Sequence, residues 1–183
     1  MTHTLYSMQN SGNCYKPRLL MHQIGIPFQL VDTDSFDGST RTPEYLALNP
    51  NGKVPLLILP DGRKLAESNA MLLHLAEGTP FLPGDRYERA LCYQWLFFEQ
   101  YSHEPYIAVA RFIVAFAGRE QEERERLATL RGKGNAALAV MEQALALTPF
   151  LTGGEFSVAD IALYAYTHVA AEGGFDLEAY PQV

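Results

Sequence analysis

The most constraining feature of the sequence is an abrupt change of pattern at GTPFLPGDR, residues 78–86, which holds two glycines and two prolines among nine residues. Clusters of this kind mark turns and linkers. Before this stretch, short strand-like runs alternate with helix-like runs, whereas after it every long segment has helical periodicity. The change predicts a small α/β domain over residues 1–77, a linker over residues 78–86 and an all-helical domain over residues 87–183.

The α/β domain is predicted to have the element order β-α-β-α-β-β-α. HTLYS and FQLVD are strand candidates on either side of a helical stretch that Gly25 and Pro27 end. Two strands joined through a helix favour parallel pairing with a right-handed crossover. A short helix capped by Thr42, a hairpin turning at PDG and a helix in SNAMLLHLAEG complete the order. In the second domain, Ser157 to Asp160 match a helix-capping box.

Charge and composition argue against several classes of function. The 183 residues carry a formal net charge of -7, so a nucleic-acid partner has no electrostatic support. The two cysteines, Cys14 and Cys92, are too few for a disulfide framework. The chain begins without a secretory signal pattern, and no apolar run reaches the length of a membrane span. We therefore expect a cytoplasmic protein that binds neither nucleic acid nor membrane.

The stretch SMQNSGNCYKPRLL, residues 7–20, has the frame of a Cys-x-x-Cys redox motif with Ser11 in place of the first cysteine. A proline is tolerated only within the first four helical positions, so Pro17 predicts a helix that begins near Asn13, with Asn13 as its N-cap. A helix N-terminus favours an anion such as a thiolate, and the Ser11 hydroxyl can donate a hydrogen bond to a thiolate of another molecule. The alternative is that Ser11 and Asn13 only cap the helix. Cys14, in the second position of the frame, is interpreted as structural.

Two further motifs offer groups that suit a peptide ligand. In NPNGKVPLL, a cis Val54–Pro55 bond would turn the N–H and C=O of Val54 outward, where they pair with an extended peptide. A trans proline at the start of an edge strand is the alternative. In AESNA, Glu67 and Ser68 at a helix start suit the ammonium and carboxylate of an amino acid, and simple N-capping by Ser68 is the alternative.

Taken together, these motifs resemble the cytosolic glutathione S-transferase family. A hydroxyl in the first cysteine position, Val-Pro before the third strand and Glu-Ser opening the third helix occur in the family's order. The stretches NSGNCYKPRL, RTPEYLALNPNGKVPLL, LAESNAMLLHLAEGTPFLP and FFEQYSHEPYIAVARF look most like bacterial members related to the theta, beta and nu classes. The resemblance implies a thioredoxin-like first domain and an all-α second domain. It also implies a chain that continues beyond Val183, because relatives have further helices there.

The resemblance implies roles for residues at the reacting end of glutathione. Ser11 would hydrogen-bond the glutathione sulfur, and Asn13 matches a nearby polar position that some bacterial classes use. Val54 would hydrogen-bond the cysteinyl backbone, with Pro55 in the cis form. On this interpretation, Ser11 replaces the nucleophilic cysteine of the redox motif, and the protein instead activates the thiol of glutathione.

The resemblance also implies contacts at the two ends of the tripeptide. Glu67 and Ser68 would hold the γ-glutamyl end. Lys53 lies where many members contact the glycine carboxylate, with Arg41 as a second candidate.

The helical stretch FFEQYSHEPYIAVARF is predicted to place polar groups along one face. At α-helical spacing, that face holds Tyr101, Glu104, Ala108 and Arg111. Pro105 is expected to bend the helix near Tyr101. In the family this helix lines the electrophile pocket, so Tyr106 and Arg111 are candidates for that pocket. The alternative is an Arg-Glu surface pair beside aromatic core residues.

The resemblance implies an enzyme, a transferase that binds glutathione as co-substrate, stabilises its thiolate and directs it at a small hydrophobic electrophile, as in detoxification. Nucleophilic attack needs activation and positioning, so no metal is expected. Two alternatives stay open. One is a glutathione-dependent disulfide reductase or peroxidase of the nu type, and the other is a non-catalytic binding or regulatory module.

A homodimer is also predicted. The helix in SNAMLLHLAEG carries Met71, Leu72, Leu73 and Leu75, which is more apolar surface than one face needs against its own sheet. Exposed apolar surface of this kind usually marks a contact between proteins.

Overall fold

The computed structural model describes residues 2–183 and divides the chain into two compact units. One unit runs to Thr79, and the other runs from Pro80 to Val183. The separate linker predicted at residues 78–86 stays a prediction. Within residues 2–183, no helix combines the length and apolar character that crossing a membrane requires.

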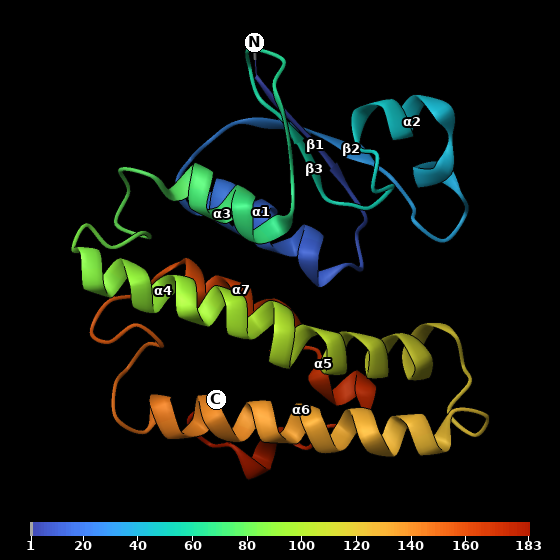
Figure 1. Ribbon diagram of the computed structural model, residues 1–183, viewed down its shortest axis with the longest axis vertical. Helices are drawn as coiled ribbons and strands as arrows, with labels where there is room; N and C mark the ends of the chain where they lie inside the picture. The colour runs from blue at the N-terminus through green and yellow to red at the C-terminus, as the bar shows by residue number, and fades with distance from the viewer. Residues whose placement is uncertain (1) are drawn as a thin grey trace. The chain divides into compact units, whose positions relative to one another are not determined.

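The first unit is a four-stranded sheet with three helices, in the predicted order β-α-β-α-β-β-α. Its strands β1 to β4 span His3–Ser7, Phe28–Asp32, Leu56–Ile58 and Lys64–Ala66. Its helices α1 to α3 span Gly12–Gln23, Pro43–Leu48 and Ser68–Ala76, and a 3-10 turn spans Ser39–Arg41. Helices α1 and α3 lie side by side along the sheet, whereas α2 lies apart from them (Figure 1).

The strand order is β2-β1-β3-β4, with β1 and β2 parallel and the other two pairs antiparallel. The parallel pair follows from the crossover through α1, as predicted. The antiparallel pair β3–β4 is the predicted hairpin, which turns at Gly62 with a φ of 87°. Buried side chains from the sheet and from α3 form the core, among them Leu5, Leu57, Met71 and Leu72. This core holds the N-terminal ends of α1 and α3 on the same scaffold.

Helix α1 begins two residues earlier than predicted. Ser11 is the N-cap: its backbone is extended, and its Oγ accepts a hydrogen bond from the Cys14 N–H at 3.3 Å. Pro17 therefore lies inside the helix, where it has no N–H to donate to the carbonyl of Asn13. The prediction of Asn13 as N-cap was wrong, because a serine cap can begin a helix even when a proline follows in its second turn.

The second unit is helical. Helices α4 to α7 span Arg86–Phe98, Glu104–Arg111, Arg124–Leu145 and Val158–Thr167. Two π-helical segments, η2 and η3, span Glu99–His103 and Phe112–Phe116, and two 3-10 turns span Ala170–Gly173 and Leu177–Ala179. The predicted capping box is confirmed: Ser157 Oγ accepts from the Ala159 N–H, and Asp160 Oδ2 accepts from the Ser157 N–H at 2.8 Å.

The segment η2 overturns one prediction about α5. Tyr101 is 83% exposed, whereas Arg111 is only 9% exposed, so the two do not share a face. A π turn holds more residues than an α turn, and it therefore breaks the α-helical spacing between the residues before and after it. The prediction assumed a continuous α-helix; instead, η2 ends at His103, and Pro105 lies in the first turn of α5.

Candidate active site

The N-terminal ends of α1 and α3 meet through side chains of two predicted motifs. The Ser68 hydroxyl donates a hydrogen bond to Asn13 Oδ1 at 3.1 Å, although the two residues are 55 positions apart in the sequence. Ser68 is 5% exposed and is the first residue of α3, so it does not cap the helix. The alternative of N-capping by Ser68 was therefore wrong. The N-cap position belongs to Glu67, whose side chain makes no capping hydrogen bond.

A buried lysine, which the sequence patterns did not point to, joins this pair. Lys16, in the second turn of α1, has 0% exposed surface. Its Nζ donates to Asn13 Oδ1 at 2.9 Å, to Ser68 Oγ at 3.3 Å and to Asn69 Oδ1 at 3.3 Å. We call Asn13, Lys16, Ser68 and Asn69 the Lys16 cluster. A lysine three residues after Asn13 on the same helix was the available signal, but its burial depends on α3.

Ser11 lies at the start of α1, where its hydroxyl proton can be donated either to the Cys14 sulfur or to a bound ligand. Its oxygen accepts the hydrogen bond from the Cys14 N–H, and a hydroxyl that accepts one bond can still donate another. Burial raises the pKa of the Cys14 thiol, although the Met8 N–H and the hydroxyls of Ser11 and Ser7 partly offset this effect. Cys14 is fully buried and stays a neutral thiol at neutral pH, which supports its structural interpretation.

The Val54–Pro55 peptide bond is cis, as the resemblance implied. Within the described part of the chain, the N–H and C=O of Val54 have no hydrogen-bond partner. The preceding carbonyl, that of Lys53, accepts from the Tyr45 hydroxyl and from Asn49 Nδ2, both at 2.8 Å. Burial raises the pKa of Tyr45 to about 12, so the phenol stays a hydrogen-bond donor. These two bonds fix the loop that presents Val54.

Glu67 has a strained backbone at the start of α3. Its φ of 68° makes it the one non-glycine residue with positive φ among residues 2–183. Such a conformation costs about 1–3 kcal/mol and persists where the surrounding structure enforces it. The Glu67 side chain is exposed at the beginning of α3, where the first N–H groups have no partner within the helix. The strain thus places a carboxylate beside an anion-binding helix end.

The two candidates for contacts near the glycine carboxylate lie in the loop before β3. The Lys53 side chain is exposed. Arg41 donates from Nη1 to the Asn51 carbonyl at 3.2 Å, and a Cβ at Gly52 would lie 2.5 Å from the same nitrogen. Arg41 is therefore tied to its own loop, while Lys53 is open to solvent.

The two candidates in α5 have contacts within the second unit. Arg111 Nε donates to Glu172 Oε2 at 2.7 Å, and its guanidinium lies 4.9 Å from the centre of the Phe116 ring. Lys133 Nζ lies 5.1 Å from the centre of the Tyr106 ring. The Arg111 contacts resemble the predicted alternative, an Arg-Glu pair beside an aromatic ring, but the arginine is buried rather than on the surface. A contact of Tyr106 and Arg111 with an electrophile stays a prediction.

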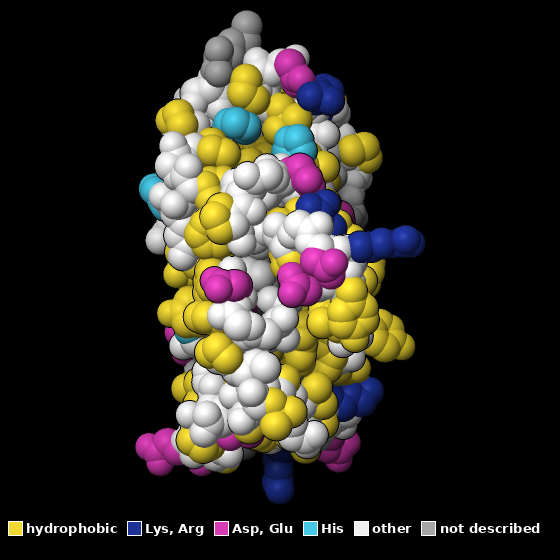
Figure 2. All heavy atoms as spheres, turned by 90° about the vertical axis from the view of Figure 1, so that its left-hand side faces the viewer, with side chains coloured by type: hydrophobic (Ala, Val, Ile, Leu, Met, Phe, Trp, Pro, Cys, Tyr) yellow, Lys and Arg dark blue, Asp and Glu magenta, His cyan; other side chains and the backbone are white. Residues whose placement is uncertain are grey.

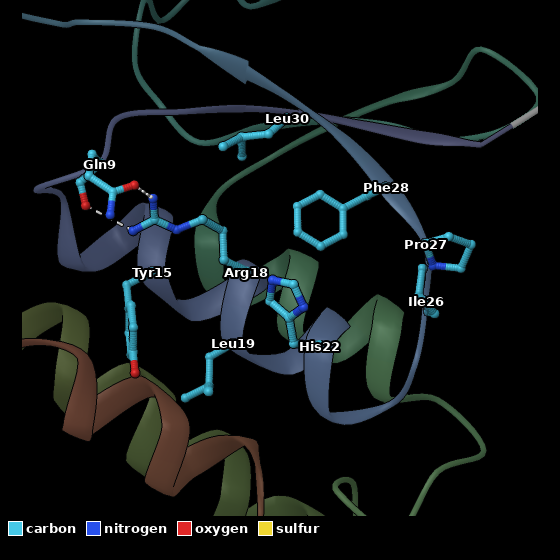
Figure 3. Close-up of a pocket in the computed structure, with 9 residues that line it drawn as sticks. All are labelled: Gln9, Tyr15, Arg18, Leu19, His22, Ile26, Pro27, Phe28 and Leu30. Carbon is cyan, nitrogen blue, oxygen red and sulfur yellow. Dashed lines mark hydrogen bonds between the residues drawn. The ribbon is translucent and has the colours of Figure 1, made fainter.

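A cavity of about 680 Å³ lies between α1 and β2 (Figure 3). Arg18 reaches Gln9 there, donating to its side-chain oxygen at 2.8 Å and to its carbonyl at 2.9 Å. The rings of His22 and Phe28 meet edge to face at 5.2 Å. None of the predicted site residues lines this cavity. Among residues 2–183, no group of three or more His, Cys, Asp or Glu side chains is arranged to hold a metal ion.

The glutathione S-transferase N-terminal domain family matches residues 10–77 of the chain, and the corresponding C-terminal domain family matches residues 109–183. A crystal structure of a glutathione S-transferase from Pseudomonas fluorescens Pf-5 is 52% identical to the chain, with a TM-score of 0.98. That match covers 100% of this chain and 90% of the other. The chain belongs to the glutathione S-transferase family.

Three further relatives of the chain range from a glutathione transferase to proteins named for other functions. A glutathione transferase from Burkholderia graminis, with two glutathione molecules bound per subunit, is 30% identical with a TM-score of 0.85, covering 100% of this chain and 80% of that one. The disulfide-bond oxidoreductase YfcG of Escherichia coli is 31% identical, covering 93% of this chain and 82% of that protein. The Ure2 protein of Eremothecium gossypii is 27% identical, and this chain spans 62% of its length. The predicted relation to the theta, beta and nu classes stays a prediction.

Proposed function

We propose that this glutathione S-transferase binds glutathione in its first unit, stabilises the thiolate and directs it at a small hydrophobic electrophile. The observation that carries the proposal is the meeting of Asn13 and Ser68, which joins the N-terminal ends of α1 and α3. The N–H groups in the first turn of a helix have no partner within that helix, so two such ends favour two anions, and glutathione offers a thiolate and a carboxylate. The glutathione bound to the Burkholderia graminis relative supports this choice of ligand.

The thiolate is proposed to lie at the start of α1. There the Ser11 hydroxyl would turn its proton from the Cys14 sulfur to the sulfur of glutathione, while its oxygen goes on accepting from the Cys14 N–H. A charge-assisted hydrogen bond from Ser11 and the helix end both lower the pKa of a bound thiol. Asn13, one residue into the helix, is the second donor for the same sulfur.

Main-chain and end-group contacts hold the rest of the tripeptide in this proposal. The N–H and C=O of Val54 pair with the cysteinyl backbone. Glu67 binds the γ-glutamyl ammonium, and the backbone N–H groups at the start of α3 bind its carboxylate. Ser68 takes part through its N–H, because its hydroxyl is already bonded to Asn13 and Lys16. Lys53 extends to the glycine carboxylate.

Three assays test the proposal against its rivals. Purified protein is given glutathione with chlorodinitrobenzene, with a hydroperoxide, or with a glutathione mixed disulfide. We expect conjugation of chlorodinitrobenzene, and calorimetry should detect glutathione binding. Binding without turnover of any of the three would favour the non-catalytic module, and no binding would overturn the proposal.

Glutathione-dependent disulfide reduction is the second candidate, and the 31% identity to YfcG favours it. The same site serves both reactions, since a bound glutathione thiolate attacks either a carbon or a sulfur electrophile. Turnover of the mixed disulfide that exceeds conjugation at equal substrate concentration would make it the main activity.

The protein is also proposed to be a homodimer, but not through α3 as the sequence suggested. Met71, Leu72 and Leu75 are buried within the chain, so the predicted excess of exposed apolar surface on α3 was wrong. The exposed stripe lies on α4 and η2 instead, at positions three or four residues apart. It consists of Tyr87, Ala90, Gln94, Phe97 and Tyr101. Exposed aromatic residues without a charge among them suit a contact with a second copy.

Light scattering tests the dimer. The wild type should have the mass of two chains at micromolar concentration, and Phe97→Glu should shift it to one chain, because a charge would enter an apolar contact. Leu147→Glu is the matched control, since Leu147 is also strongly exposed and lies outside the stripe. A monomeric wild type would overturn the proposal.

The proposed setting is cytoplasmic detoxification of electrophiles. On the face drawn in Figure 2, acidic and basic side chains of the described residues are scattered among hydrophobic ones, without an extended basic patch. With a net charge of -7, this surface gives no support for a nucleic-acid partner.

A further inference from the structure

Lys16 is a buried ammonium group with three hydrogen-bond acceptors on three residues. Its Nζ donates to oxygens of Asn13, Ser68 and Asn69, at 2.9, 3.3 and 3.3 Å. An ammonium group has three donors, and burying it is costly unless they are satisfied. The acceptors come from both α1 and α3, so Lys16 is held at a defined place between the two helix ends.

The Lys16 cluster determines which way the side-chain amide of Asn13 points. Asn13 Oδ1 accepts from Lys16 Nζ and also from the Ser68 hydroxyl, at 2.9 and 3.1 Å. If the amide flipped, its NH₂ group would face the Lys16 ammonium, which has no lone pair to accept a hydrogen bond, so the bond to Lys16 would be lost. The oxygen is therefore fixed towards Lys16, and the NH₂ end is fixed on the opposite side of the amide group.

Because Asn13 lies at the start of α1, the orientation of its amide decides whether it can stabilise a glutathione thiolate there. Asn13 is the second residue of α1, next to the Ser11 cap and in the first turn, where the helix end favours an anion. An asparagine stabilises a thiolate only through its NH₂ group, because its oxygen would repel the charge. A fixed donor also needs no reorientation when the thiolate forms.

We propose that Lys16 is a positioning residue that fixes Asn13 with its NH₂ group towards the glutathione thiolate. The inference rests on the proposed function. It assigns to Lys16 no contact with glutathione, since Lys16 acts through Asn13. The buried Ser68 hydroxyl donates to the same Asn13 oxygen from α3.

The test is the pKa of the thiol of bound glutathione, followed by thiolate absorbance in Lys16→Met. Methionine has a similar length without donors or charge. We expect the thiol pKa to rise by about one unit, which means about tenfold less thiolate and about tenfold lower kcat well below that pKa. The loss should disappear at high pH, while the KM for glutathione changes little.

Arg18→Met is the matched control, because Arg18 is a cation on the same helix that donates hydrogen bonds to Gln9, outside the Lys16 cluster. If both variants raise the thiol pKa equally, the charge of α1 is responsible and the proposal fails. A Lys16→Met protein with a lower melting temperature but an unchanged thiol pKa would show a purely structural role and would also overturn it.

A double-mutant cycle tests whether Lys16 acts through Asn13. In an Asn13→Ala background, Lys16→Met should cause no further rise of the thiol pKa. An equal rise in both backgrounds would contradict the proposal.

Asn13→Asp keeps the inference testable if Lys16→Met does not fold. Aspartate retains oxygens for Lys16 and Ser68 but has no N–H to donate, so the protein should fold and the thiol pKa should rise. An unchanged thiol pKa in Asn13→Asp would overturn the proposal. A wild type that binds no glutathione would refute the proposed function itself, which is a different result.

Discussion

Lys16 and Arg111 are buried cations in helices, one in each unit, and their bonding partners differ in kind. Arg111 is paired with the carboxylate of Glu172 and lies over an aromatic ring. The three oxygens bonded to Lys16 belong to two amides and a hydroxyl at helix starts. A carboxylate neutralises its partner, which is the arrangement of a structural ion pair. Amide and hydroxyl acceptors have a second end that the cation orients, so burial alone does not identify the role of a cation.

If Arg111 is structural, unlike Lys16, Arg111→Met should mainly lower the stability of the protein, and this is the largest effect that we expect. Removing the guanidinium takes away the bond to Glu172 and the contact with Phe116, while Glu172, 45% exposed, regains water. We expect a loss of about 2–3 kcal/mol in the free energy of unfolding, measured with urea. If the folded variant also loses conjugation activity, Arg111 takes part in the electrophile pocket and the comparison with Lys16 weakens.

The second largest effect is expected at Glu67, where backbone strain should affect stability and the carboxylate should affect the affinity for glutathione. Glu67→Gly removes the carboxylate and relieves the positive φ, since glycine adopts such a backbone without steric cost. The affinity for glutathione, measured by calorimetry, should fall by about 1.5–3 kcal/mol.

The unfolding free energy of the same Glu67→Gly variant should stay equal or rise. In Glu67→Ala the affinity should fall equally, without the gain in stability. Unchanged affinity in both variants would remove Glu67 from the site.

Ser11→Ala should have a smaller effect that depends on pH. Losing the donor should raise the pKa of the bound glutathione thiol by about one unit, or about 1.4 kcal/mol. Turnover should therefore fall at neutral pH and recover as pH rises, because thiolate becomes plentiful. The cap is lost too, at about 1 kcal/mol of stability, so binding and turnover are measured on folded protein. An identical thiolate titration in wild type and variant would leave Asn13, fixed by Lys16, as the donor.

The smallest effect is expected at the two cysteines of the protein. Burial raises the pKa of Cys14, and it raises the pKa of Cys92 to about 11. At pH 8 both thiols are therefore protonated in the folded state, and native protein should react slowly with iodoacetamide. Reaction should become fast only after unfolding, because both side chains are fully buried. Rapid labelling of Cys14 at pH 7 would indicate a reactive thiol and favour a redox mechanism.

The fold was predictable because its signals are local. Strand alternation, helical periodicity and turn residues such as the glycine at position 62 are readable along the chain, and they gave the correct element order. The capping box at Ser157 was predictable for the same reason. The cis bond before Pro55 came from the family resemblance, since most bonds before proline are trans.

The rest depended on contacts between distant residues or on small changes of register. Lys16 is buried against α3, whose first residue, Ser68, is 52 positions further along the chain. The periodicity of α1 alone therefore does not predict that Lys16 is buried. The π turn before α5 changes which residues share a face without changing the composition of the segment. An excess of apolar surface on α3 was predicted, because its apolar residues were counted against the sheet without the α1 surface that also contacts them.

Within residues 2–183, the N–H and C=O of Val54 have no partner, and this affects which forms of glutathione the protein can distinguish. A ligand that pairs with them is recognised through atoms common to every residue, so this contact measures the length and direction of the tripeptide and ignores the group attached to its sulfur. Free glutathione, a conjugate and a mixed disulfide would therefore be held in the same register. Discrimination among these three ligands then depends on the space beyond the sulfur. The conjugate formed in the reaction would compete with glutathione for the main-chain groups of Val54.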